Sequence, residues 1–335
     1  MTRIFTTRRG TALTALAIGA ALALSACASG APEGGEQSDP AGAGASSEGF
    51  PVTLPSFYGD VTVEEKPEKI VVLSAQYADM LAAIDVEPVA FNASVTDMEA
   101  FHATYPWLEG AQVGELDNAM VNAEYQAVLE AIAKHDPDLI LTTTFQVDED
   151  LYEQISTIAP TFVGEQAGSN KWDELLEDVA LLVGEPEAAE AAAAEVETAY
   201  ADAREAMPGL EGRTYQSTGF DGTKFWWGNG SWLDGFGLVP ADNQDNSQSG
   251  NGTNDISLEN IDQLDADVLG IWFWQTDQAA LEADPRYQKL PAVQHNAVIV
   301  PDLPLANATN SAGPLSLVWA IDWVTEQLAG STIAQ

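Results

Sequence analysis

Aromatic and amide side chains gather in this chain where predicted strands end. They are Tyr77, Asn92, Phe145, Phe220, Trp226, Trp227, Trp272, Trp274 and Asn307. Such side chains bury the apolar surface of a ligand and supply hydrogen bonds, so their chemistry is noncovalent binding. Ligands of open α/β sheets bind at the carboxyl ends of strands, which makes these residues candidate ligand contacts. Because side chains alternate along a strand, we expect at most one of each neighbouring aromatic pair to face the ligand.

Residues for enzymatic or metal chemistry follow no recognisable pattern. The three histidines, His102, His135 and His295, are scattered without metal-ligand spacing. The segment around Ser231 lacks the Gly-x-Ser-x-Gly of a nucleophile elbow, and the chain has no phosphate-binding Gly-x-x-x-x-Gly-Lys loop. We therefore expect no enzyme, no cofactor and no metal held directly by side chains. A secreted, lipid-anchored hydrolase is the alternative from another class.

The elements that must position these residues alternate between strands and helices. Hydrophobic runs predict strands at 70–73, 86–91, 138–144 and 160–163, followed in the second half by 213–217, 224–227, 267–273 and 297–300. Helical spacing predicts helices at 77–84, 151–158, 172–183 and 314–328. Strand–helix–strand units imply parallel sheets, so the fold class is α/β.

One long helix is predicted from Pro186 to Met207. Ala and Glu dominate it, Pro186 suits the first helical position, and Pro208-Gly209 ends it. About 22 residues at about 1.5 Å each give roughly 33 Å, the width of a small domain. We interpret it as a strut (186–208) between an N-terminal lobe (50–185) and a C-terminal lobe (209–335). An ordinary surface helix of a single domain is the alternative.

The first 49 residues have the composition of an export signal and a tether. Residues 1–26 combine a basic start with a short apolar run, as in a signal peptide. Leu24-Ser25-Ala26-Cys27 resembles the bacterial lipobox, which implies cleavage before Cys27 and lipidation of its thiol. Residues 27–49 are rich in Gly, Ala, Ser and Glu, and so predict a flexible tether. We expect a protein anchored by lipid to the extracytoplasmic face of the cell membrane.

The charge of the chain restricts its partners. The formal net charge is −40. Removal of residues 1–26 takes away three arginines and leaves 9 basic and 52 acidic residues, a net charge of −43. Such a surface repels phosphate backbones, which argues against nucleic-acid binding. It also disfavours strongly anionic ligands, unless a local basic pocket overrides the field.

Three stretches resemble the substrate-binding proteins of iron–siderophore and vitamin B12 ABC importers. The first begins at Lys66-Pro-Glu-Lys-Ile-Val-Val-Leu-Ser. The others are Leu129-Glu-Ala-Ile-Ala-Lys-His-Asp-Pro-Asp-Leu-Ile-Leu141 and Ser257-Leu-Glu-Asn-Ile-Asp-Gln-Leu-Asp-Ala-Asp-Val-Leu269. The resemblance implies two Rossmann-like lobes joined by a single long helix. It also implies that Glu130 and Glu259, one on each lobe, pair with arginines of the permease.

The resemblance and the composition together predict the cargo. With few histidines, iron is expected to arrive already chelated, as a ferric siderophore. Only Arg213 and Lys224 in the second lobe, and Lys66 or Lys69 in the first, are expected near the cleft. A cleft rich in tryptophan and poor in arginine favours a hydroxamate siderophore over an anionic catecholate or citrate. Haem, with Tyr77 or Tyr105 as axial ligand, and cobalamin are alternatives. We expect a monomer that delivers its ligand to an ABC permease.

Overall fold

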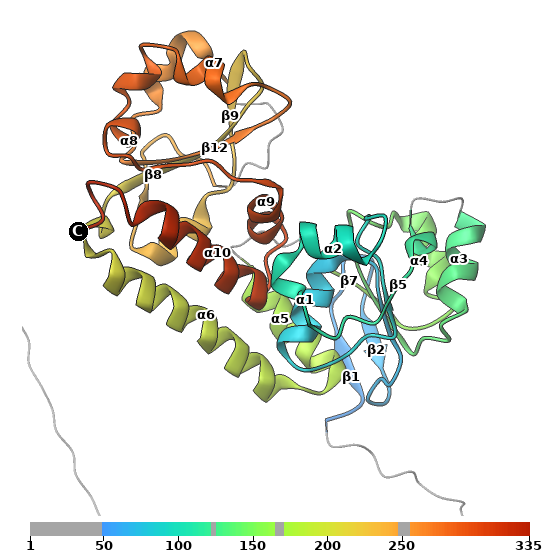
Figure 1. The fold of residues 1–335 in the computed structure, drawn as a ribbon. Coiled ribbons are helices and arrows are strands. Elements are labelled where there is room, and N and C mark those ends of the chain that lie inside the picture. Colours follow the sequence, from blue (N-terminus) through green and yellow to red (C-terminus); the bar gives the residue numbers. More distant parts are fainter. Residues whose placement is uncertain (1–48, 122–124, 165–170, 247–254) are drawn as a thin grey trace, which may run out of the picture. The chain divides into compact units, whose positions relative to one another are not determined.

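The computed structural model describes residues 49–121, 125–164, 171–246 and 255–335. The predicted signal peptide, Cys27 and all of the predicted tether except Gly49 lie outside these residues. The described residues belong to one compact unit and form two α/β lobes joined by a long helix, α6 (Figure 1). The predicted fold class is therefore confirmed. In the described part of the chain, no helix combines the length and the hydropathy that a membrane span requires.

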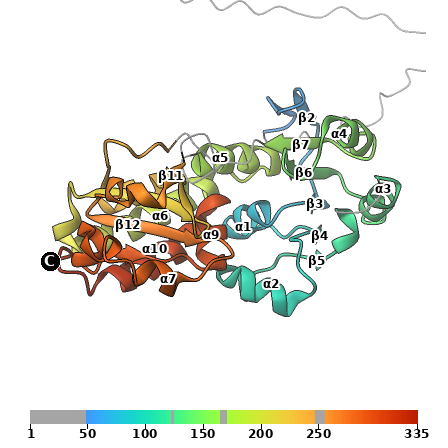
Figure 2. The same ribbon diagram turned by 90° about the horizontal axis from the view of Figure 1, so that it is seen from above.

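The N-terminal lobe is built on a parallel sheet. Its strand order is β5-β4-β3-β6-β7, with bounds Glu115–Leu116, Ala90–Phe91, Ile70–Val72, Leu139–Thr143 and Thr161–Gly164. Helices α1 (Ala75–Ala83) and α5 (Trp172–Val183) lie on one face, and α3 (Tyr125–Ala133) and α4 (Glu149–Ile155) on the other (Figure 2). Two short strands, β1 (Val52–Leu54) and β2 (Val61–Val63), form a separate antiparallel pair. The strand-and-helix alternation of the sequence thus gives the predicted parallel sheet.

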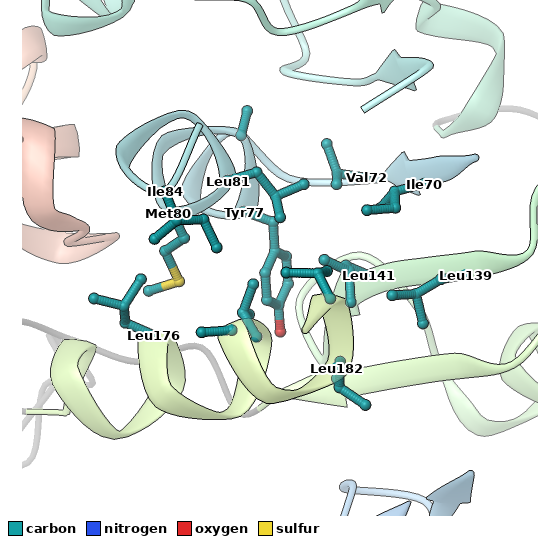
Figure 3. Close-up of a cluster of buried hydrophobic side chains, with 14 of the residues drawn as sticks. Ile70, Val72, Tyr77, Met80, Leu81, Ile84, Leu139, Leu141, Leu176 and Leu182 are labelled. Atoms are coloured by element: carbon teal, nitrogen blue, oxygen red, sulfur yellow. The ribbon is translucent and has the colours of Figure 1, made fainter. Parts of the chain in front are cut away.

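The core of this lobe explains why its strands are continuous hydrophobic runs. Ile70 and Val72 face α1 and α5, while Val71 faces the helices on the opposite side. A strand covered on both faces has no need for polar alternation. Figure 3 shows Tyr77 of α1 in the core between the sheet and helices α1 and α5, among leucines and isoleucines.

Helix α6 (Pro186–Ala206) contributes one apolar stripe to two cores. Ala189 and Ala192 pack into the core of the N-terminal lobe, whereas Val196, Tyr200 and Ala203 pack into that of the C-terminal lobe. A surface helix of one domain would bury its stripe in one core. The division of the stripe identifies α6 as the link between the lobes.

The C-terminal lobe repeats the arrangement around a mixed sheet. Its order is β11-β9-β8-β12-β13, with bounds Ile256–Ser257, Lys224–Trp227, Thr214–Phe220, Val268–Phe273 and Val298–Ile299; β10 (Val239–Pro240) also pairs with β8. Strands β8, β12 and β13 are parallel, and β9 is antiparallel to β8. One face packs against α6, the 3₁₀ helix η4 (Ser231–Phe236), α9 (Leu303–Asn310) and α10 (Pro314–Leu328). The other face packs against η5 (Leu258–Gln263), α7 (Gln278–Glu282), η6 (Tyr287–Lys289) and α8 (Pro291–Gln294).

The lobes also touch directly, through α1 and the start of α10. Both carboxylate oxygens of Asp79 accept backbone hydrogen bonds, from Leu315 at 3.0 Å and from Ser316 at 2.9 Å. The side chain of Gln76 donates to the carbonyl oxygen of Ala312 at 2.9 Å. The long helix is therefore not the sole link between the lobes.

Candidate functional site

A pocket of about 270 Å³ lies where the two lobes meet. Its lining residues from the N-terminal lobe are Ser74, Ala75, Gln76, Asp79, Asn92, Ala93, Ser94, Tyr105, Trp107, Thr143, Phe145 and Gln146. Those from the C-terminal lobe are Asn307, Asn310 and Ser311. The first group follows the carboxyl ends of β3, β4 and β6, where the rule for open α/β sheets places a ligand.

Strand ends hold their polar residues through local hydrogen bonds. Ser74 follows β3, and its hydroxyl accepts from the backbone N–H of Gln76 at 3.3 Å, which caps α1. Asn92 follows β4 and is 1% exposed. Its amide donates to the carbonyl oxygen of Asp117 at 3.3 Å, and its oxygen accepts from the N–H of Ser94 at 3.0 Å. Asn92 therefore fixes the shape of the pocket wall as much as it offers a contact.

Phe145, unlike the buried Asn92, is largely exposed to solvent. It follows β6, lines the pocket and is 77% exposed. A phenyl ring held in water at the edge of a pocket gains free energy when a ligand covers it.

The C-terminal lobe contributes one helix and the turn after it. Asp302 caps α9 by accepting from the N–H of Leu305 at 2.9 Å. Asn307 and Asn310 are three residues apart on this helix, so both reach the same side of it. Two carboxamides and the hydroxyl of Ser311 then face the N-terminal lobe across the pocket.

Tyr105 and Trp107 complete the wall and were not predicted as pocket contacts from the strand ends. They belong to a segment formed by α2 (Met98–Thr104) and the 3₁₀ helix η1 (Pro106–Leu108), between β4 and β5. Their ring centroids are 5.6 Å apart in an edge-to-face arrangement, and Trp107 also contacts Trp319 of α10 at 5.5 Å. Burial raises the pKa of Tyr105, which keeps it a neutral phenol. The run Tyr105-Pro-Trp107 was the available sequence signal.

Of the nine predicted ligand contacts, Asn92, Phe145 and Asn307 line this pocket. Trp226, Trp272 and Trp274 do not line it. Trp226 and Trp272 flank Gly219 on neighbouring strands, and a Cβ atom on Gly219 would lie 2.0 Å from the Trp226 ring. Trp226 therefore lies against the sheet over a glycine, half-exposed.

The other three predicted contacts, Tyr77, Phe220 and Trp227, are core residues. Tyr77 is completely buried (Figure 3), and its hydroxyl accepts from the backbone N–H of Gly164 at 3.2 Å. Phe220 and Trp227 are 2% and 6% exposed in the core of the C-terminal lobe. Their aromatic character serves packing, and in this conformation they offer no surface to a ligand. In the pair Trp226 and Trp227, the side chains point to opposite faces, as alternation requires.

No Lys or Arg side chain in the described ranges lines this pocket. The four basic residues expected near the cleft each pair with a carboxylate. Lys66 contacts Glu185 at 2.5 Å, Lys69 contacts Asp136 at 2.6 Å and Arg213 contacts Asp267 at 3.4 Å, while Lys224 pairs with Asp255. The first three precede β3 and β8, at the amino ends of the sheets, which are far from the ligand edge in this fold.

Among the described residues, no group of three or more His, Cys, Asp or Glu side chains is placed to hold a metal ion. His135 instead contacts Asp117 at 3.1 Å, and Lys134 contacts the same carboxylate at 2.6 Å.

The two glutamates expected to dock a permease are both exposed. Glu130 lies on α3 and accepts from the side-chain amide of Gln126 at 2.8 Å. Glu259 lies in η5, which Ser257 caps through a 3.3 Å hydrogen bond from the N–H of Glu259. The hydrogen bond to Asp284 is the main cause of a raised pKa of the nearby Arg286 guanidinium. The negative charge of Glu259 also raises this pKa.

Two lobes, a connecting helix and a polar pocket between them define a ligand-binding protein. A family model described as "Periplasmic binding protein" matches residues 70–303, which is most of the chain, so the chain belongs to this family. The resemblance noted in the sequence is thereby confirmed at the level of the family. Membership also confirms a binding protein of a transport family rather than an enzyme.

Two curated relatives are bacterial. The chain is 31% identical over 149 residues to the ferric enterobactin-binding periplasmic protein FepB of Escherichia coli O6:H1, covering 42% of this chain and 45% of that protein. It is 31% identical over 121 residues to the Fe(3+) dicitrate-binding periplasmic protein FecB of Escherichia coli K12, covering 35% and 36%. The chain thus spans less than half the length of these curated relatives.

Solved structures agree with the fold over a larger part of the chain. A periplasmic solute binding protein from Mycobacterium smegmatis matches with 25% identity and a TM-score of 0.64, covering 83% of this chain and 98% of that one. PiaA from Streptococcus pneumoniae in complex with ferrichrome matches with 22% identity and a TM-score of 0.66, covering 83% and 97%. The second match shows the fold alone.

Proposed function

We propose that this protein is the substrate-binding protein of an ABC importer, which captures a ferric siderophore of the hydroxamate type between its lobes and delivers it to a permease. The observation that carries the choice of cargo is the pocket lining, which offers amides, hydroxyls and aromatic rings without Lys or Arg. Ferrioxamines and ferrichromes are neutral or mildly cationic and need no cationic partners. Ferric catecholates and citrates are strongly anionic and would need them.

The names of the relatives support an iron complex as the cargo, and they make an anionic iron complex the second candidate. FepB and FecB are named for ferric enterobactin and ferric dicitrate, and PiaA was solved with ferrichrome. The first two names favour an anionic iron complex for this chain. The charge of the pocket favours the third.

Titration of the intrinsic tryptophan fluorescence separates the two candidates. Purified protein is titrated with ferrioxamine B, ferrichrome, ferric enterobactin and ferric dicitrate at one ionic strength. We expect a hydroxamate to quench the fluorescence at the lowest concentration. Saturation by ferric enterobactin or dicitrate at a far lower concentration would reject the hydroxamate assignment and leave the architecture intact.

Haem and cobalamin are weaker candidates for the same pocket. An axial tyrosine ligand acts as a tyrosinate, but Tyr77 is in the core and burial raises the pKa of Tyr105. Cobalamin requires no such ligand and is tested directly. Absorption spectra after incubation with haem, cobalamin or ferrioxamine B and gel filtration show which chromophore stays bound.

The membrane anchor is part of the proposal, since Cys27 and the tether lie outside the described residues. Lipidation at Cys27 would hold a monomeric protein at the extracytoplasmic face of the cell membrane. Mass spectrometry of the mature N-terminal peptide should find a diacylglyceryl group on Cys27. A Cys27→Ala variant that remains in the membrane fraction would contradict the anchor.

Docking to the permease is proposed for Glu130 and Glu259. Each carboxylate is exposed, and each lies on a different lobe. A bidentate contact with an arginine on each side would let the permease bind both lobes at once.

A further inference from the structure

We infer that Asp79 and Gln76 are positioning residues of the pocket, because they fasten the turn between α9 and α10 to the N-terminal lobe. This turn follows directly on Asn307, Asn310 and Ser311, the contribution of the C-terminal lobe to the lining. The inference deepens the proposed function and rests on it, since it assumes that this pocket holds the ligand.

Asp79 caps a helix that belongs to the other lobe. Helix α10 begins after Gly313, which has no side chain to accept from the free N–H groups of the first turn. Asp79, 1% exposed, supplies both acceptors: one carboxylate oxygen accepts from Leu315 at 3.0 Å and the other from Ser316 at 2.9 Å. The partners are 236 and 237 residues apart in the chain.

Gln76 adds a third bond one turn earlier on α1. Its side-chain amide donates to the carbonyl oxygen of Ala312 at 2.9 Å, and the residue is 2% exposed. The three hydrogen bonds therefore hold residues 312–316 at both ends. Ser311, which lines the pocket, directly precedes Ala312. The pocket wall formed by the C-terminal lobe therefore cannot shift without breaking buried hydrogen bonds.

The contact leaves no spare room. A Cβ atom on Gly313 would lie 2.6 Å from both Cγ and Oδ1 of Asp79. The carboxyl group thus touches the backbone of the turn, so the lobes cannot come closer together at this point. Caps such as Asp148, which accepts from Leu151 at 2.9 Å in α4, hold one lobe together and have no such effect.

Substitutions on either side of the contact test the inference. Asp79→Ala removes the acceptors, and Gly313→Ala pushes them away from the opposite lobe. With ferrioxamine B as the probe, we expect each variant to raise Kd about tenfold, the effect of about one good buried hydrogen bond. We also expect faster hydrogen exchange at the amides of Leu315 and Ser316. The double variant should be little worse than Asp79→Ala, because the two atoms 2.6 Å from the new methyl group are gone and only the Cβ atom of residue 79 remains, at 3.1 Å.

Asp148→Ala is the matched control, since it removes an aspartate cap within one lobe outside the pocket. It should leave Kd and the exchange of residues 315 and 316 unchanged. If Asp79→Ala and Gly313→Ala lower only the melting temperature and keep the wild-type Kd, the positioning role is overturned. Because Asp79 itself borders the pocket, the Gly313→Ala result and the exchange at Leu315 and Ser316 decide between positioning and direct contact, and they decide also if Asp79→Ala fails to fold.

The proposed cargo and the positioning role fail in different ways. If the wild-type protein binds neither ferrioxamine B nor ferrichrome, the cargo assignment fails, and hydrogen exchange alone tests the contact. Faster exchange at Leu315 and Ser316 in both variants would then support the contact, and unchanged exchange would overturn it.

Discussion

Phe145 is the pocket residue with the most surface to lose to a ligand. It is 77% exposed, so its ring contributes little to folding and much to any complex that covers it. Phe145→Ala should weaken binding of the cargo roughly 10- to 100-fold, the value of burying one phenyl ring, and leave the unfolding free energy almost unchanged. Fluorescence titration and urea unfolding measure the two quantities.

The control for this prediction is Phe57→Ala. Phe57 is also largely exposed, at 53%, but it does not line the pocket. Equal loss of affinity in both variants would show that Phe145 does not contact the ligand specifically.

Asp79 makes stability depend on pH in an unusual direction for a carboxylate. Burial raises its pKa to about 6, although the N–H groups of Ser316 and Leu315 favour the charged form. Because the folded-state pKa lies above the unfolded value, its contribution to stability is full at low pH and is lost as pH rises through about 6. Relative to Asp79→Asn, the wild-type free energy of unfolding should fall by on the order of 3 kcal/mol between about pH 4 and 7.

Urea unfolding of both proteins across this pH range checks the prediction. The difference between them isolates Asp79 from the other carboxylates, such as Asp284, whose bond to Arg286 lowers its pKa to about 2. A difference that stays constant with pH would show that Asp79 titrates normally.

At this scale the sequence was informative where a residue follows a strand. Asn92 and Phe145 were found because the carboxyl end of a predicted strand is a local signal. Tyr105 and Trp107 reach the pocket through the packing of α2 and η1; their aromatic run is visible in the sequence, but its place beside the pocket is not. Tyr77, also placed after a strand, turned inward because α1 begins at Ala75 and directs that side chain to the core.

Among the elements, η4 packs closely against α6 at a glycine. A Cβ atom on Gly235 would lie 2.4 Å from the ring of Tyr200, whose hydroxyl donates to the carbonyl oxygen of Trp232 at 2.8 Å. Gly235→Ala should therefore force the ring aside and lower the free energy of unfolding by about 1–3 kcal/mol. Urea unfolding gives the value.

Gly330→Ala is the matched substitution, since its nearest neighbour would be 3.8 Å away. It should cost little. If both variants are equally stable, α6 and η4 have room to move apart, and α6 is a looser link than its packing indicates.

Helix bounds were predictable and strand bounds less so. Residues 172–183 and 314–328 form helices with the predicted limits, because hydrophobic periodicity and flanking Gly or Pro are local. The predicted strand 86–91 is reduced to Ala90–Phe91, since Val86 donates to Leu81 at the end of α1 and Pro88 has no N–H. Strand β8 runs on to Phe220, because Thr218 and Gly219 find partners on both neighbouring strands.

At the scale of the whole molecule, the proposed docking requires the permease to contact both lobes. Glu130→Ala and Glu259→Ala should leave the Kd for the cargo unchanged, and together they should reduce siderophore-dependent iron uptake by at least about tenfold. Uptake of radioactive iron by cells that carry the variants in place of the wild-type gene measures this. Glu190→Ala, an exposed glutamate of α6, is the control. Uptake that matches this control would remove the docking role.

The two-lobed architecture could be predicted from alternating elements, the helix at 186–207 and the family resemblance. The contact of α1 with the start of α10 could not be predicted. It depends on Asp79 and Ser316, which are 237 residues apart and carry no pattern that links them. The placement of the basic residues was also out of reach, because an ion pair such as Lys66 with Glu185 joins distant segments.

The pairing of Lys66, Lys69, Arg213 and Lys224 with carboxylates affects the rate of ligand association. With these four cations paired with carboxylates and a formal net charge of −40, the protein has a field that attracts cations from beyond contact range. Added salt should therefore slow the bimolecular encounter with a cationic ferrioxamine, and speed that with an anionic complex. Stopped-flow association rates at two ionic strengths would reveal the sign.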